Sequence, residues 1–216
     1  MAQFAKSIFV VRHGQTTSQI DRDSGVLDAS YDLVLTNPNK DSSLTHFGRT
    51  QVEQLNLDAI KHSLIKNSVI ILSATTLRCQ ETAEIITENL QKSGVTVSIF
   101  HTIELNEPRS IAFHGVAFTF DKVDRLKNLA IAFGEKQLDF SQIETQIAFC
   151  DRTRATLFSY LDKPEFSDCV IIFVTHHYNC RVMLNIADGD CELMAERAIA
   201  NGSMHELEFK NFAKSV

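Results

Sequence analysis

The sequence predicts a single α/β domain, built as a three-layer α/β/α sandwich with a mostly parallel central sheet. The chain has 216 residues, 44% hydrophobic and 22% charged, which suits one ordinary globular domain. Residues 8–11, 69–72 and 170–174 form short apolar runs rich in Val and Ile, typical of strands buried on both faces. Segments with helical spacing lie between these runs. Because strands that alternate with helices favour a parallel sheet covered on both faces, we expect one domain over residues 1–216.

Weaker patterns complete the predicted elements. Residues 95–100 predict a further strand, and the alternation over residues 205–209 predicts an edge strand near the C-terminus. Thr45 is a suitable N-cap for a helix that we expect to run to about Ile65. Apolar residues at helical spacing over 79–90 and 180–187 predict two more helices, each with one buried face.

Two stretches do not follow this alternation of strands and helices. Ser18 to Ser43 is polar and contains turn residues, and Pro108 to about Phe140 is rich in Phe. In sheets of this kind, ligands bind at the carboxyl ends of the strands. We expect both stretches to cover that edge, with residues 108–140 as an insertion over the active site.

Composition and charge exclude several classes of function. The formal net charge is −6 and no run of Lys and Arg interleaves with aromatic residues, so we expect no nucleic-acid partner. The longest apolar run is about seven residues, too short to span a membrane, and the N-terminus lacks a signal-peptide pattern. The five cysteines lack metal-ligand spacing and are expected to be reduced thiols. We therefore expect a cytoplasmic protein without a membrane partner. The sequence leaves the oligomeric state open and is compatible with a homodimer.

A candidate nucleophile follows the first predicted strand directly, in Arg12-His13-Gly14. The strand end would deliver Arg12 and His13 to the carboxyl edge, where Gly14 lets the backbone approach a ligand closely. Gln15 and Thr16 add donors in the turn that follows. A neutral imidazole at His13 could attack phosphorus if a backbone carbonyl fixed its other ring nitrogen. The alternative is an ordinary Arg-His pair in a surface turn.

Two more candidates follow the other buried strands. His176 comes directly after residues 170–174 and Thr175, and Arg78 lies in the segment after residues 69–72. A guanidinium near a helix start can hold two phosphate oxygens in a fork, and the helix amides favour the same anion. A histidine that caps a strand and a solvated helix arginine are the alternatives. The joint occurrence of these residues after three buried strands favours a phosphate pocket.

Short motifs in one order along the chain carry a family resemblance: Arg12-His13-Gly14, Arg78-Cys79-Gln80-Glu81-Thr82-Ala83, Leu105-Asn106-Glu107 and Val174-Thr175-His176. Leu44 to Gln51 and Asn201-Gly202-Ser203 add two weaker motifs. As a set they resemble the histidine phosphatase superfamily, which includes the cofactor-dependent phosphoglycerate mutases. The resemblance spans nearly the whole chain and implies a phosphoglycerate mutase-like fold.

The resemblance also implies a role for each candidate residue. His13 would take up the phosphoryl group and become phosphohistidine, while Arg12, Arg78 and His176 would bind the phosphate oxygens. Glu107 would protonate the leaving oxygen and then activate the water that hydrolyses the phosphoenzyme. Because the arginines and histidines supply the positive charge, the resemblance implies no metal and no cofactor.

Some positions depart from the family's pattern. His177 stands where the family most often has Gly, and Gln19 stands where mutases tend to have Asn. Glu104 is the rival of Glu107 for the acid, although the Leu-Asn-Glu pattern favours Glu107. Candidate substrate contacts beside the catalytic set are Gly14, Gln15, Thr16, Gln19 and His177.

The sequence thus predicts a metal-independent phosphomonoester hydrolase of the histidine phosphatase type. Its substrate would be a phosphorylated small molecule or a phosphoprotein, with sugar phosphates, phosphohistidine proteins and nucleotide-like phosphates all open. A phosphoglycerate mutase-type isomerase is one alternative, which the lack of a mutase-like Arg-His-Tyr-Gly motif after Glu107 disfavours. A non-catalytic module that binds a phosphoprotein or phosphometabolite is the other, which the intact His13 and Glu107 disfavour.

Overall fold

The structure is a computed structural model, and part of the chain can be described in it. The described residues are 7–17, 42–64, 68–107, 111–113, 116–118, 144–190 and 195–209. Of residues 111–113 and 116–118 only the backbone is described. The predicted coverings, Ser18 to Ser43 and Pro108 to Phe140, lie almost entirely outside these ranges, so their position over the site stays a prediction.

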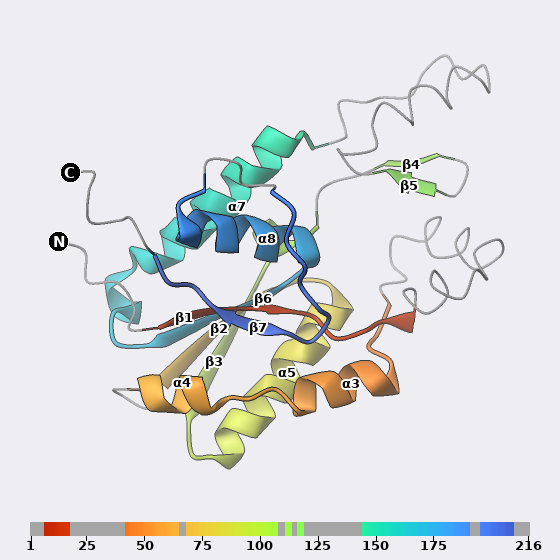
Figure 1. Ribbon diagram of the computed structural model, residues 1–216. Helices are drawn as coiled ribbons and strands as arrows, with labels where there is room; N and C mark the ends of the chain where they lie inside the picture. The colour runs from red at the N-terminus through yellow and green to blue at the C-terminus, as the bar shows by residue number, and fades with distance from the viewer. Residues whose placement is uncertain are drawn as a thin grey trace, which may run out of the picture.

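A five-stranded sheet forms the centre of the molecule, in the order β3-β2-β6-β1-β7 (Figure 1). Its strands are β1 (Ile8–Arg12), β2 (Ser68–Ala74), β3 (Thr96–Thr102), β6 (Val170–Thr175) and β7 (Met204–Glu206). All neighbours pair in parallel except β7, which pairs antiparallel with β1 at the edge. The mostly parallel sheet and the C-terminal edge strand are therefore as predicted.

Helices cover both faces of this sheet, which gives the three layers that the sequence predicts. The helices are α3 (His46–Glu53), α4 (Asp58–Ser63), α5 (Leu77–Lys92), α7 (Gln146–Leu161) and α8 (His177–Asp188), with short 3-10 turns η1 (Ile103–Leu105) and η4 (Pro164–Phe166). Figure 1 shows α7 and α8 on one face and α3, α4 and α5 on the other. A separate antiparallel pair, β4 (Ile111–Phe113) and β5 (Val116–Phe118), lies beside this body. No helix within the described ranges is long and apolar enough to cross a membrane.

The strand register brings the carboxyl ends of the parallel strands level with one another. Every residue of β6 is buried, as expected for a central strand that is apolar throughout. Arg12 of β1 is the register partner of Thr175 of β6, and Ala74 of β2 is that of Thr102 of β3. Residues that directly follow these strands therefore meet at one edge of the sheet.

Two details of the helices differ from the prediction. The single helix expected from Thr45 to about Ile65 is interrupted between α3 and α4. The side chain of Asn56 accepts a hydrogen bond from the amide of Asp58 at 3.0 Å, a local bond that competes with the helical pattern. Helix α7 has no counterpart in the prediction, because polar side chains such as Thr153 occupy its buried face.

Candidate active site

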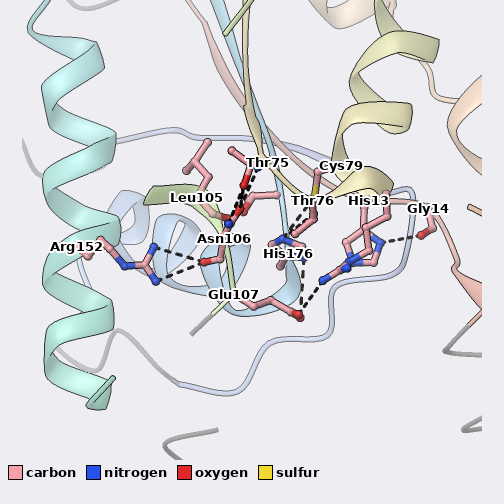
Figure 2. A network of polar contacts seen from close by, with 12 residues as sticks. His13, Gly14, Thr75, Thr76, Cys79, Leu105, Asn106, Glu107, Arg152 and His176 are labelled. Atoms are coloured by element: carbon pink, nitrogen blue, oxygen red, sulfur yellow. Dashed lines mark hydrogen bonds and ion pairs between the residues drawn. The ribbon is translucent and has the colours of Figure 1, made fainter. Parts of the chain in front are cut away.

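Residues that follow each of the four parallel strands lie together in one site at the carboxyl edge of the sheet. His13 follows β1, Thr76 follows β2, Glu107 follows β3 and η1, and His176 follows β6. Figure 2 shows these four side chains around one another. The arrangement is the one that the strand register dictates.

The ring of His13 is buried and held in one orientation. Its side chain lies 4% exposed, and Nδ1 is 2.8 Å from the carbonyl oxygen of Gly14. Because a carbonyl can only accept, the proton of the neutral ring belongs on Nδ1, and the lone pair is left on Nε2. The backbone N–H of His13 donates to the carbonyl of Thr175 at 3.0 Å, which ties the residue to the end of β6. This is the orientation that a nucleophilic imidazole needs at this strand end.

The ring of His176 packs edge-on against that of His13. The centroids are 5.2 Å apart with an interplanar angle of 69°, and His176 is 0% exposed. Its Nε2 is 3.3 Å from the hydroxyl of Thr76 and 3.6 Å from the thiol of Cys79. Its Nδ1 lies 3.9 Å from Oε1 of Glu107 and has no hydrogen-bond partner within the described part of the chain.

Burial and neighbouring charges favour the neutral form of both rings. Burial is the main reason that the pKa of His13 lies well below 6.5, and His176 and Arg78 lower it further. Burial also holds the pKa of His176 well below 6.5, with Arg78 and Arg12 acting in the same direction. Both imidazoles are therefore neutral at neutral pH, one with a free lone pair and the other able to donate a proton in a hydrogen bond.

Arg78 and Glu107 form an ion pair at the open side of the histidines. Nη2 of Arg78 donates to Oε2 of Glu107 at 2.9 Å, with side chains 16% and 48% exposed, respectively. Arg78 is the second residue of α5, where the helix start favours an anion. Arg12 donates through Nη1 to the carbonyl of Ile199. The site thus combines cationic groups near the histidines with a carboxylate that water can reach.

The rival carboxylate, Glu104, faces a different partner. Its Oε2 lies 4.0 Å from Nε of Arg152, and its backbone carbonyl accepts a hydrogen bond from the same guanidinium. Glu107 instead contacts Arg78 and approaches His176. The geometry places Glu107, and not Glu104, beside the histidines.

Close packing of two glycines joins the loop after β1 to the first turn of α3. A Cβ on Gly14 would lie 2.4 Å from the carbonyl oxygen of Gly48, and one on Gly48 would lie 2.1 Å from that of Gln15. Thr45 caps this turn, since its hydroxyl accepts from the amide of Gly48 at 2.9 Å. The amide of Gly14 donates to the hydroxyl of Thr82 at 3.3 Å. The loop that holds His13 is therefore set directly against two helices.

The next predicted substrate contacts along the chain are Gln15, Thr16 and Gln19. The amide of Gln15 donates to Oε1 of Gln51 at 3.0 Å, and Thr16 is buried in a bridge to Leu44. Both therefore support the loop in this structure. Gln19 lies outside the described residues.

His177 begins α8, directly after His176. Its Nε2 is 3.1 Å from Nη2 of Arg181 one turn later, and burial lowers its pKa from the ordinary value. The side chain is half-buried beside the site. Whether it meets a substrate stays a prediction.

Sequence reasoning assigned no role to three groups that hold the Glu107 segment. The amide side chain of Asn106 accepts from the backbone N–H of Thr75 at 2.9 Å and donates to its hydroxyl at 2.9 Å. The hydroxyl of Thr175 donates to the carbonyl of Leu105. Arg152 approaches from α7 (Figure 2). Asn106 lay within a recognised motif, whereas no local pattern indicates Arg152.

The part of the chain that the structure describes contains no group of three or more His, Cys, Asp or Glu side chains arranged to hold a metal ion. Its four cysteines, Cys79, Cys150, Cys169 and Cys180, form no disulfide.

A three-layer α/β/α fold with two neutral histidines, an arginine and a carboxylate at its carboxyl edge defines a site suited to phosphoryl transfer. The sequence model of the histidine phosphatase superfamily (branch 1) matches residues 8–216. The chain belongs to that superfamily and is an enzyme of the histidine phosphatase type, as the sequence motifs indicated.

Solved structures with the same fold include three that cover almost the whole chain. The α-ribazole phosphatase of Shigella flexneri is 18% identical, with a TM-score of 0.59, over 93% of this chain and 89% of its own. YhfR of Bacillus stearothermophilus is 19% identical, with a TM-score of 0.61, over 93% and 89%. A mycobacterial glucosyl-3-phosphoglycerate phosphatase in complex with VO3 is 18% identical, with a TM-score of 0.54, over 94% and 92%. No curated protein sequence matches the chain significantly. These likenesses establish the phosphoglycerate mutase-like fold.

Proposed function

We propose that the protein hydrolyses phosphomonoesters through a phosphohistidine on His13, without a metal ion. One observation carries the proposal: the neutral ring of His13, fixed through Nδ1 by Gly14, lies against His176 at the edge where Arg78 and Glu107 meet. This reaction needs a nitrogen lone pair, a hydrogen-bond donor, a cation and a carboxyl group.

In the first step, Nε2 of His13 attacks phosphorus and a P–N bond forms. The bond between phosphorus and the ester oxygen breaks, and its electron pair goes to the leaving oxygen. Glu107, in its protonated form, gives that oxygen its proton, so the alcohol leaves neutral. In this step the phosphoryl group takes Arg78 as its partner in place of Glu107.

In the second step, the carboxylate of Glu107 takes a proton from water as the water oxygen attacks phosphorus. The P–N bond breaks, its electron pair returns to Nε2 of His13, and inorganic phosphate leaves. Glu107 is again protonated and ready for the next ester. Its 48% exposed side chain gives water access to this step, which favours hydrolysis over return of the phosphoryl group to a bound substrate.

The substrate class that we propose is a phosphorylated small molecule. Two structural relatives are named as phosphatases of such molecules, α-ribazole phosphate and glucosyl-3-phosphoglycerate. The four cysteines that the structure describes form no disulfide, which fits an enzyme that works in the cytoplasm.

The first test is turnover of p-nitrophenyl phosphate at mildly acidic pH with excess chelator, for wild type and His13→Ala. We expect phosphate release from the wild type only, and an acid-labile phosphoenzyme of the wild type in rapid-quench mass spectrometry. The control is His101→Ala, which removes an exposed histidine of β3 and should keep full activity. Hydrolysis by His13→Ala, or loss of wild-type activity on chelation, contradicts the proposal.

The second test concerns Glu107. Glu107→Gln should slow hydrolysis most for esters with poor leaving groups, by about 100-fold or more, because an activated phenolate leaves without a proton. A larger effect of Glu104→Gln than of Glu107→Gln would assign the acid to the other carboxylate.

A further inference from the structure

The segment that carries Glu107 is held to the sheet from one side. It runs from η1 to Glu107, directly after β3. The side chain of Asn106 is bonded to the amide and hydroxyl of Thr75, and the carbonyl of Leu105 accepts from Thr175. These contacts hold the segment against the carboxyl ends of β2 and β6.

A guanidinium from α7 holds the same segment from the other side. Nη1 of Arg152 donates to the carbonyl of Glu104, and both Nη1 and Nη2 lie 3.4 Å from the carbonyl of Asn106. Figure 2 shows Arg152 reaching toward Asn106 from the helix opposite the histidines. The carbonyl of Asn106 belongs to the peptide bond that joins Asn106 to Glu107. Arg152 therefore contacts the peptide unit from which the catalytic carboxyl extends.

Glu144 in turn orients the guanidinium of Arg152. Nε is 2.7 Å from Oε1 of Glu144, and Nη2 is 2.8 Å from Oε2, a two-pronged ion pair. The side chains are 12% and 8% exposed, so solvent screens the pair little. This fork uses the Nε side of the guanidinium and leaves the remaining donors for the two carbonyls.

We infer that Arg152, oriented by Glu144, is a positioning residue for Glu107. The inference rests on the proposed function, in which Glu107 moves the proton. The planar guanidinium supplies donors in fixed directions, so it sets both the place and the orientation of the peptide unit before Glu107. A lysine cannot do this, because one ammonium group cannot hold the carboxylate fork and two carbonyls at once. A shift of about 1 Å at a catalytic group can cost about 100-fold in rate.

The geometry predicts a loss that depends on the leaving group. When Arg152 is changed, Glu107 is displaced, while His13, His176 and Arg78 keep the strand ends and the helix start that position them. Transfer from an activated aryl phosphate then proceeds nearly as before, while transfer from an ester with a basic leaving group slows. A general weakening of the fold would lower both rates alike.

The test measures kcat/KM for a series of phosphate esters with leaving groups of increasing basicity. The variants are Arg152→Lys, Arg152→Ala and Glu144→Gln, with Arg154→Ala as the control, since Arg154 forms an exposed pair with Asp151 on the same helix. We expect Arg152→Lys and Arg152→Ala to lose about tenfold or more on the poorest leaving groups and less than about threefold on p-nitrophenyl phosphate. Glu144→Gln should show the same pattern more weakly, and Arg154→Ala should match wild type. Arg152→Lys and Glu144→Gln keep a polar group in place should Arg152→Ala fail to fold.

A double variant separates positioning from an independent role. If Arg152 acts through Glu107, Arg152→Lys should cost nothing further in the Glu107→Gln background. Equal loss across the ester series, or full additivity with Glu107→Gln, overturns the inference while the proposed function stands. A Glu107→Gln variant without leaving-group dependence contradicts the proposed acid itself, and the inference about Arg152 with it.

Discussion

The ring centroids of His13 and His176 lie 5.2 Å apart, with both rings almost wholly removed from solvent. The pairing follows from the parallel register of β1 and β6, in which Arg12 faces Thr175, so the next residue of each strand meets the other. Burial is the main cause that disfavours a proton on either ring, and the neighbouring arginines act in the same direction. The neutral rings are therefore reactive at neutral pH, and their burial lowers the folding stability in acid.

The first prediction is that folding stability falls as the pH drops through about 6.5. Burial holds the pKa of both rings below that of the unfolded chain, so acid protonates the unfolded state first. The unfolded state then binds more protons than the folded state, and the free energy of unfolding decreases toward low pH. Each histidine contributes up to about 1.4 kcal/mol per pH unit in this window.

Urea unfolding at pH 7.5, 6.5 and 5.5 measures this dependence. A His13→Asn/His176→Asn variant should show a flatter dependence, since other titrating groups are common to both proteins. An unchanged slope in that variant would show that the two rings are not the source.

The second prediction concerns Thr76, whose hydroxyl lies 3.3 Å from Nε2 of His176. A proton donated to Nε2 keeps the ring proton on Nδ1, the nitrogen that faces Glu107. Thr76→Val should therefore lower kcat/KM by about tenfold or more, while Thr76→Ser keeps most of the activity. The side chain of Thr76 makes no capping bond to α5, so the helix should lose little stability. Equal activities of Thr76→Val and Thr76→Ser would assign the tautomer to another contact, such as Cys79.

The sheet and the histidine pair could be predicted from the sequence because both depend on local patterns. Buried strands of a parallel sheet read as short apolar runs, and His13 and His176 directly follow two of them. Parallel pairing of β1 with β6 then brings the two residues together at the carboxyl edge. Arg78 was found in the same way, two residues into the helix that follows β2.

The contacts of the Glu107 segment could not be predicted, because no local pattern carries them. Arg152 and the carbonyl of Asn106 meet only when α7 packs beside η1, 46 residues away along the chain. Helix α7 itself was missed, since Thr153 and Thr156 lie on its buried face where apolar residues are expected. The Arg152 contact and helix α7 both depend on tertiary packing, which the hydrophobic periodicity of the sequence does not report.

The third prediction is that Gly48→Ala destabilises the fold, although alanine favours helices by about 1 kcal/mol. The new Cβ would lie 2.1 Å from the backbone carbonyl oxygen of Gln15, so the loop after β1 must move. We expect a net loss of about 2 kcal/mol or more in urea unfolding, together with lower activity because His13 lies on that loop.

Gly94→Ala is the control for Gly48→Ala. Gly94 has a φ of 79° and nothing near its missing side chain, so alanine there costs only the backbone strain, about 1 kcal/mol. Similar losses at the two positions, or unchanged activity of Gly48→Ala, would count against the close contact between the loop and α3.

The last prediction uses inorganic phosphate as a probe of the ion pair between Arg78 and Glu107, 2.9 Å apart. Phosphate and the Glu107 carboxylate compete for the same guanidinium, and their negative charges repel each other. Glu107→Gln should therefore bind phosphate more tightly, whereas Arg78→Lys should bind it about tenfold more weakly because the two-pronged contact is lost. Isothermal titration at pH 7.5 gives both dissociation constants, with Arg154→Lys as a control that should match wild type. Weaker binding by Glu107→Gln would mean that the carboxyl donates to phosphate in the complex, and the exchange of partners at Arg78 in the proposed first step would then be wrong.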